Sequence, residues 1–212
     1  MQLTPSMRSA LTAGVAVTVL LTGTAGAVAA PAAPPAPAAS ATPAAPTAHS
    51  PYGQLRPLAA LSAERLATAD LVAAAKWGTG SPVEDPARER EVLRAVAEQA
   101  RELGADPAVT VRVFRDQIEA GKTVQRALHR AWDADPGRAP TERPGLAEVR
   151  REINRVNGEL VRALAASPSA RSAPYCTPLL TAAAVRVRHE RRLDGLHTGA
   201  LARSLRSVCD GR

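Results

Sequence analysis

Two cationic side chains stand in an apolar stripe of one predicted helix. In the segment from Glu64 to Glu89, Arg65 and Lys76 are spaced so that an α-helix presents both on the same side. The rest of that stripe is apolar and consists of Leu58, Leu61, Ala69 and Val72. A buried cation is costly unless an anion meets it. The spacing therefore predicts a ligand or partner with negative charge at this face.

Polar groups also fall on the apolar faces of three later segments. They are Arg88 and Glu89, Gly121 and Gln125, and Arg150 and Asn157. Only Glu89 and the neighbouring Asp85 offer negative charge, so ion pairs within the chain cannot neutralise all the cations. Long Arg and Lys side chains can reach from the edge of an apolar face into water, which explains any one of them. The whole set favours a pocket with surplus positive charge, suited to a small ligand with about two carboxylates or phosphates.

The common catalytic motifs are missing from the sequence. There is no Gly-rich phosphate loop, no HExxH and no GxSxG. The four histidines are scattered along the chain. The predicted site thus lacks an obvious nucleophile or general base. This favours ligand binding, or a reaction driven by positioning and electrostatics.

Helices must position these residues. Aromatic residues make up only 2% of the chain, and Ala, Leu and Val supply most of its apolar content, which favours packed helices over a sheet. Start signals, stop signals and apolar spacing predict helices over 58–77, 85–103, 106–132, 146–164, 178–191 and 194–208. Charged or Pro-rich loops are expected at 133–145 and 167–174. The sequence predicts an all-α, single-domain bundle of about six helices over residues 52–212.

The N-terminal region is typical of an exported protein. Residues 1–29 have a basic start at Arg8, an apolar span and a cleavage motif that ends at Ala29, which predicts a signal peptide. An uncleaved membrane anchor is the alternative, because the uncharged span approaches the length of a transmembrane helix. Residues 30–51 are rich in Pro and Ala and are expected to form a disordered linker.

The two cysteines, Cys176 and Cys209, flank the last two predicted helices. In an exported protein such a pair predicts a disulfide. A catalytic or metal-binding thiol is the alternative, but no CxxC motif and no Cys/His spacing supports it. We therefore expect one disulfide and no metal site.

The basic charge of the chain does not by itself predict a nucleic-acid partner. The formal net charge is +7, but no run of five or more basic residues occurs. Few aromatic residues are available to stack on bases. We expect most of the arginines to lie on a solvated surface.

The ordered set of polar residues resembles the all-helical AroQ-type chorismate mutases. The set consists of Arg65, Lys76, the DPARER segment with Asp85, Arg88 and Glu89, and Gln125 within QIEAGKTVQ. Arg150 on a later helix, and the cysteine pair after a signal peptide, are similar to the secreted gamma subclass. The resemblance covers residues 62–209. It implies a rearrangement of chorismate to prephenate that needs no metal or cofactor.

The resemblance also implies a role for each residue. Lys76 and Gln125 would hydrogen bond to the ether oxygen of chorismate, and Arg65 and Arg150 would bind its two carboxylates. Arg88 would help to hold the substrate. The ring hydroxyl would be received by Glu89 together with the backbone near Asp85. The site would lie within one chain, and family precedent suggests a homodimer.

Gly121 departs from the family pattern, because relatives often place a Ser or Thr hydroxyl there, near a substrate carboxylate.

Two other hypotheses about the function stay open at this point. The protein could be an exported helical module that binds a small dianion or a partner protein without catalysis. It could also be a surface adaptor held by an uncleaved N-terminus.

Overall fold

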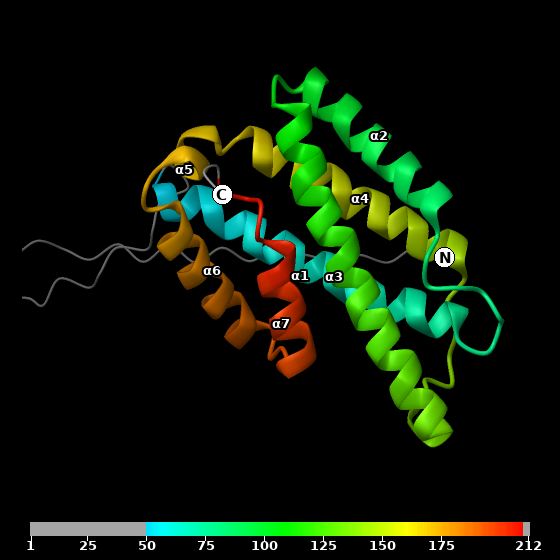
Figure 1. The fold of residues 1–212 in the computed structure, drawn as a ribbon. Coiled ribbons are helices and arrows are strands. Elements are labelled where there is room, and N and C mark those ends of the chain that lie inside the picture. The colour runs from blue at the N-terminus through cyan, green and yellow to red at the C-terminus, as the bar shows by residue number, and fades with distance from the viewer. Residues whose placement is uncertain (1–49, 210–212) are drawn as a thin grey trace, which may run out of the picture. The chain divides into compact units, whose positions relative to one another are not determined.

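The computed structural model describes residues 50–209 (Figure 1). The predicted signal peptide and cleavage site, and almost all of the predicted linker, lie outside this range. Within it the fold is entirely helical and contains no strand, which confirms the all-α prediction. None of the described helices is long and apolar enough to cross a membrane.

Seven α-helices and one short 3-10 helix make up the described fold. They are α1 (Pro51–Lys76), α2 (Pro86–Glu102), α3 (Pro107–Ala134), η1 (Pro136–Arg138), α4 (Leu146–Ala165), α5 (Pro168–Ser172), α6 (Cys176–Glu190) and α7 (Gly195–Ser204).

The ends of the early helices follow local sequence signals. Asp85 caps α2 by accepting a hydrogen bond from the backbone N–H of Arg88 at 3.0 Å, and Asp106 caps α3 in the same manner. Each cap is followed by a proline, whose missing N–H costs nothing at the first helical position. Gly78 and Gly104 follow α1 and α2 with φ near +70°, a conformation that glycine adopts without strain.

Helix α1 is the centre of the fold. It packs against α3, α4, α6 and α7, and in Figure 1 it crosses behind α3. Leu55, Leu58 and Leu66 are almost fully buried, and small alanines between them let the neighbouring helices approach closely. A helix that is surrounded on several sides buries residues all round, so any polar side chain on it needs a specific partner.

The predicted start of the first helix, near residue 58, was wrong. Helix α1 begins at Pro51, with Ser50 as its cap and Pro57 inside it. A proline in a helix interior removes a hydrogen bond and costs about 3 kcal/mol, which is why the sequence favoured a later start. Tertiary packing offsets this cost, because the first turns bury Leu55 and place Arg56 in an ion pair with Glu190 of α6 at 2.9 Å.

The predicted loop at 167–174 contains the short helix α5, which the sequence analysis missed. The helix buries Ala170 and Arg171. The guanidinium of Arg171 donates hydrogen bonds to the carbonyl oxygens of Val208 at 3.0 Å and Leu164 at 3.3 Å. These contacts between distant segments stabilise a helix that is too short to form by itself.

The predicted disulfide between Cys176 and Cys209 is present, and it joins the start of α6 to the end of the described chain. The two cysteines are 33 residues apart in the sequence. Both α6 and α7 pack on α1, and α7 packs on α3 as well. The disulfide thus closes the C-terminal helical pair against the rest of the domain.

Removal of the disulfide should lower the free energy of unfolding by roughly 3 to 4 kcal/mol, because the open chain gains conformational entropy when it unfolds. The double variant Cys176→Ala/Cys209→Ala tests this by chemical denaturation. The wild type should match the variant in a reducing agent and exceed it without one. Equal unfolding midpoints in oxidised and fully reduced wild type would contradict the expectation.

A histidine on α7 is held between two carboxylates. The ring nitrogens of His197 lie 3.0 Å from Asp70 of α1 and 2.8 Å from Asp194, the cap of α7. The hydrogen bond to Asp70, supported by Asp194, raises the pKa of His197 from 6.5 to about 9 despite its partial burial. The protonated ring therefore ties α7 to α1.

The stabilising effect of His197 should depend on pH. Its pKa is raised in the folded state, so the effect is fully present below about pH 6.5 and is lost as the pH rises through about 9. We expect His197→Gln to be less stable than wild type in acid, and the difference to vanish in alkali. The control is His189→Gln, which changes an exposed histidine of α6. A difference in unfolding free energy that does not change with pH would contradict the expectation.

Candidate active site

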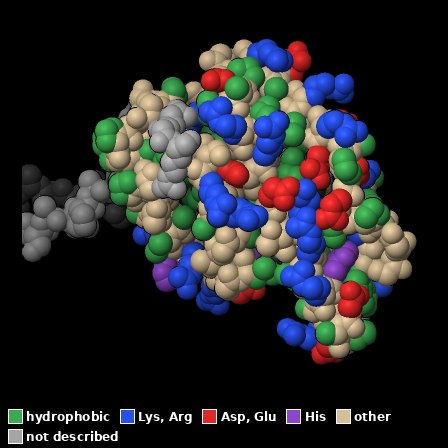
Figure 2. Space-filling view, in the orientation of Figure 1, with side chains coloured by type: hydrophobic (Ala, Val, Ile, Leu, Met, Phe, Trp, Pro, Cys, Tyr) green, Lys and Arg blue, Asp and Glu red, His purple; other side chains and the backbone are tan. Residues whose placement is uncertain are grey.

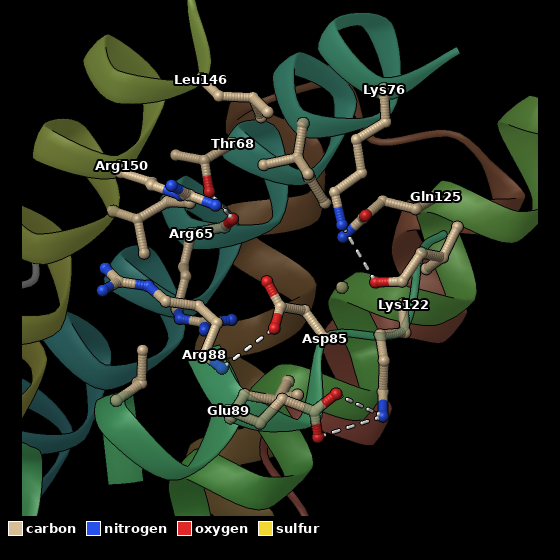
Figure 3. A pocket seen from close by; sticks show the side chains of 17 residues that line it. Arg65, Thr68, Lys76, Asp85, Arg88, Glu89, Lys122, Gln125, Leu146 and Arg150 are labelled. Carbon is tan, nitrogen blue, oxygen red and sulfur yellow. Dashed lines mark hydrogen bonds and ion pairs between the residues drawn. The ribbon is translucent and has the colours of Figure 1, made fainter. Parts of the chain in front are cut away.

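Helices α1, α2, α3 and α4 surround a cavity of about 130 Å³ (Figure 3). Its lining includes every substrate-binding or catalytic position that the sequence predicted, namely Arg65, Lys76, Asp85, Arg88, Glu89, Gly121, Gln125 and Arg150. Apolar walls come from side chains of all four helices, such as Val72, Val92, Ile118 and Leu146. Residues that are far apart in the sequence thus meet in one pocket, although their individual roles stay predictions.

Arg65 is the most deeply buried cation of the cavity, and 9% of its surface is exposed. Its Nε donates to the Asn157 side-chain oxygen at 2.9 Å, and its Nη1 donates to the Gln117 backbone carbonyl at 2.9 Å. Burial lowers the pKa of Arg65 to about 10, so the side chain is still charged at neutral pH. Its two protein partners are neutral, and its charge is therefore available to an anion.

Lys76 is the last residue of α1 and extends back over the cavity. Its ammonium group donates to the carbonyl oxygens of Pro82 at 2.8 Å and Val83 at 3.2 Å. The connection between α1 and α2 thereby fixes the lysine. Partial burial lowers the pKa of Lys76 and the charge of Arg150 lowers it further, while Asp85 acts in the opposite direction.

The other two predicted arginines differ in their partners. Arg88 donates to Glu91 at 2.7 Å and to the side-chain oxygen of Asn154 at 3.1 Å. Arg150 of α4 is exposed, and within residues 50–209 its guanidinium has no hydrogen bond or ion pair. Arg150 is therefore free to contact a ligand, whereas Arg88 would have to exchange a partner to do so.

The carboxylate of Glu89 is paired with a lysine that the sequence analysis did not select. Lys122 of α3 contacts Glu89 at 3.1 Å and Glu119 at 2.5 Å, and its side chain is 12% exposed. Burial alone would lower the pKa of Lys122, but the hydrogen bonds to Glu119 and Glu89 raise it. The two side chains form an ion pair at one side of the cavity (Figure 3).

Gln125 and Gly121 lie one turn apart on α3. The Gln125 side-chain oxygen is buried and has no hydrogen-bond partner in the described part of the chain. A Cβ atom at Gly121 would lie 3.8 Å from the Ala69 Cβ and 3.9 Å from the Arg65 Nη1, which is ordinary contact. The small residue thus leaves space beside Arg65, and the side-chain oxygen of Gln125 is left without a donor in the described part of the chain.

The charges that line the cavity do not balance. Five cationic side chains face two anionic ones, Asp85 and Glu89. No histidine, cysteine or serine is among the lining residues, and within residues 50–209 no cluster of acidic, His and Cys side chains could hold a metal ion. The arrangement can bind a compact dianion in a partly apolar setting, where hydrogen bonds to charged groups are strong.

Sequence reasoning missed Lys122 and Thr68 in the lining and did not assign Asn157 a role. Lys122 is next to Gly121, but nothing in the sequence indicates that it faces Glu89 on another helix. Asn157 carried a signal, because it lies in an otherwise apolar stripe. Figure 2 shows basic side chains of the domain scattered among acidic and polar ones on one face.

Comparisons with known proteins point to one family. A model of the family described as Chorismate mutase type II matches residues 56–126. The secreted chorismate mutases of Mycolicibacterium smegmatis and Mycobacterium tuberculosis are each 36% identical to this chain. Those alignments cover 73% and 74% of this chain, and 86% and 78% of the two relatives.

Solved structures agree with this result. The chorismate mutase of Burkholderia phymatum superposes with a TM-score of 0.71 at 37% identity, and that of Burkholderia thailandensis with 0.70 at 36%. They cover 76% and 74% of this chain, and 99% of each solved chain. The chain belongs to the type II, or AroQ-type, family of chorismate mutases.

Proposed function

We propose that this protein is an exported chorismate mutase, which converts chorismate to prephenate by an intramolecular Claisen rearrangement. One observation carries the proposal beyond the family relationship. The cavity combines a surplus of cationic side chains with the side-chain amide of Gln125, and no histidine, cysteine or serine is among its lining residues. A pericyclic reaction of a dianion needs charge stabilisation and a fixed conformer, and it needs no proton transfer.

Arg65 and Arg150 hold the two carboxylates of the substrate in this proposal. They reach the cavity from α1 and α4, and together they hold the substrate in its compact, reactive conformer. Selecting the reactive conformer in this manner lowers the entropic part of the barrier. Arg88 adds a third contact after it exchanges its bond with Asn154 or Glu91.

Lys76 and Gln125 stabilise the transition state. Negative charge builds on the ether oxygen as the carbon–oxygen bond breaks, and both side chains can donate a hydrogen bond to it. The Lys76 ammonium has used two donors on the carbonyls of Pro82 and Val83, which leaves one for the substrate. A donor that is already fixed before the reaction loses little free energy through reorientation.

Glu89 accepts the ring hydroxyl of chorismate, with the backbone near Asp85 as a second contact. Lys122 supports this role, because its ion pair with Glu89 orients the carboxylate. Asp85 also caps α2 and so positions Arg88 and Glu89 in the first turn of the helix. A water molecule in the space beside Gly121 could replace the hydroxyl that relatives often carry there.

Export is consistent with the secreted mycobacterial relatives and with the predicted signal peptide. The disulfide between Cys176 and Cys209 suits an oxidising compartment. All site positions come from one chain, so catalysis does not require a second copy. The homodimer suggested by family precedent stays a prediction, which analytical ultracentrifugation would test.

The variant Lys76→Ala should lower kcat by roughly two to three orders of magnitude, because it removes one donor to the developing charge. Turnover is followed through the loss of chorismate absorbance. The control is Arg112→Ala, which removes an exposed cation of α3 outside the cavity. If wild type and Lys76→Ala bind chorismate in calorimetry but are equally inert, the protein is a dianion-binding module and not an enzyme.

The variant Gln125→Glu should make the reaction depend on pH. An amide donates a hydrogen bond at any pH, whereas a carboxyl group donates only when it is protonated. We expect wild-type kcat to stay level from about pH 5 to about pH 7, and the variant to lose activity as its carboxyl group ionises. A wild-type rate that falls steeply in this range would show that Gln125 does not have this role.

A further inference from the structure

Arg65 shares with Lys76 the use of neutral hydrogen-bond acceptors, whereas the other two half-buried cations of the cavity pair with carboxylates. Lys122 and Arg88 each contact a carboxylate, at 2.5 Å and 2.7 Å respectively. Arg65 is more deeply buried, but no carboxylate of the described chain lies within ion-pair distance of it. It bonds instead to the Asn157 side chain and to the Gln117 backbone. A buried cation with neutral partners destabilises the free protein.

Asn157 has a defined orientation in this contact. It lies on α4 and is 5% exposed. The Nε of Arg65 is a donor and can only bond to an acceptor, so the Asn157 oxygen must face it. Together with the carbonyl of Gln117, this bond holds the guanidinium plane from two sides. The remaining N–H groups are left for the cavity, where Gly121 adds no side chain to cover them.

An aspartate at position 157 would have nearly the same shape as asparagine and would accept the same hydrogen bond. It would also neutralise Arg65, so that the buried cation would no longer lack a charged partner. The asparagine therefore accepts the same hydrogen bond that a carboxylate would accept, but it carries no negative charge. That combination is useful only if the charge of Arg65 serves a ligand.

We infer that Asn157 is a positioning residue that orients Arg65 while leaving its positive charge for a substrate carboxylate. The inference rests on the proposed function, and it adds a residue to the site for which neither sequence nor family membership supplied a role. The neutrality of Asn157 sets the preference of the cavity for dianions over ligands with less negative charge. The protein gives up some stability at this position in exchange for binding strength.

Two substitutions separate geometry from charge. Asn157→Asp retains the acceptor but neutralises Arg65, and Asn157→Leu removes the acceptor without adding charge. The control is Ser169→Asp, which adds the same charge at an exposed position of α5. For each protein, kcat and KM for chorismate are measured together with the melting temperature and the Kd of chorismate in calorimetry.

We expect Asn157→Asp to raise KM at least about tenfold and to change kcat much less, because Arg65 contacts the carboxylate in both the ground state and the transition state. Its melting temperature should equal or exceed that of wild type. Asn157→Leu should raise KM and lower the melting temperature. Ser169→Asp should leave kcat and KM unchanged.

Other outcomes overturn the inference. An Asn157→Asp variant with KM within about twofold of wild type shows that the charge of Arg65 is not reserved for the substrate. An Asn157→Asp variant that is unfolded, or less stable than wild type, shows that Asn157 has a structural role instead. If wild type does not turn over chorismate, the proposed function fails. The inference is then tested by comparing the Kd of chorismate between wild type and the Asn157 variants. Wild type that does not bind chorismate at all overturns both.

Discussion

The rest of this structure depends on an arginine that is buried without a carboxylate. Arg65 lies in the middle of α1, the helix that packs against α3, α4, α6 and α7, and its only side-chain partners in residues 50–209 are neutral. Burying such a charge costs free energy, which the surrounding apolar core must offset. In the proposed function, an anion that binds in the cavity beside Arg65 recovers that free energy.

Neutral acceptors fix both of the central cations. The carbonyls of Pro82 and Val83 hold Lys76, as Asn157 and the carbonyl of Gln117 hold Arg65. Hydrogen bonds to carbonyl and amide oxygens orient a cation without neutralising it. The Gln117 side chain in turn donates to Ser62 of α1 and to the Ser204 carbonyl of α7. Through this contact the disulfide-closed C-terminal helices support the helix that carries Gln125.

Helix ends that depend on local interactions were predicted correctly, whereas the helix start that depends on tertiary contacts was not. The start of α3 at Asp106-Pro107 and the end of α2 before Gly104 were predicted correctly, because a cap or a left-handed glycine acts within one turn. The start of α1 was placed too late, since Pro57 is locally unfavourable. Only the ion pair between Arg56 and Glu190 and the burial of Leu55 reveal why the helix continues through it.

For the site, the sequence alone determined which residue types gather on apolar faces: Arg65, Lys76, Gln125 and Arg150 are misplaced for an ordinary core, and helical spacing makes this visible. Only the tertiary structure decided what each of them contacts. The pairing of Lys122 with Glu89, and of Arg65 with Asn157, joins helices far apart in the chain. Helical periodicity specifies the direction in which a side chain points around the helix axis. The partner of that side chain depends on how the helices pack against one another, and no single segment contains that information.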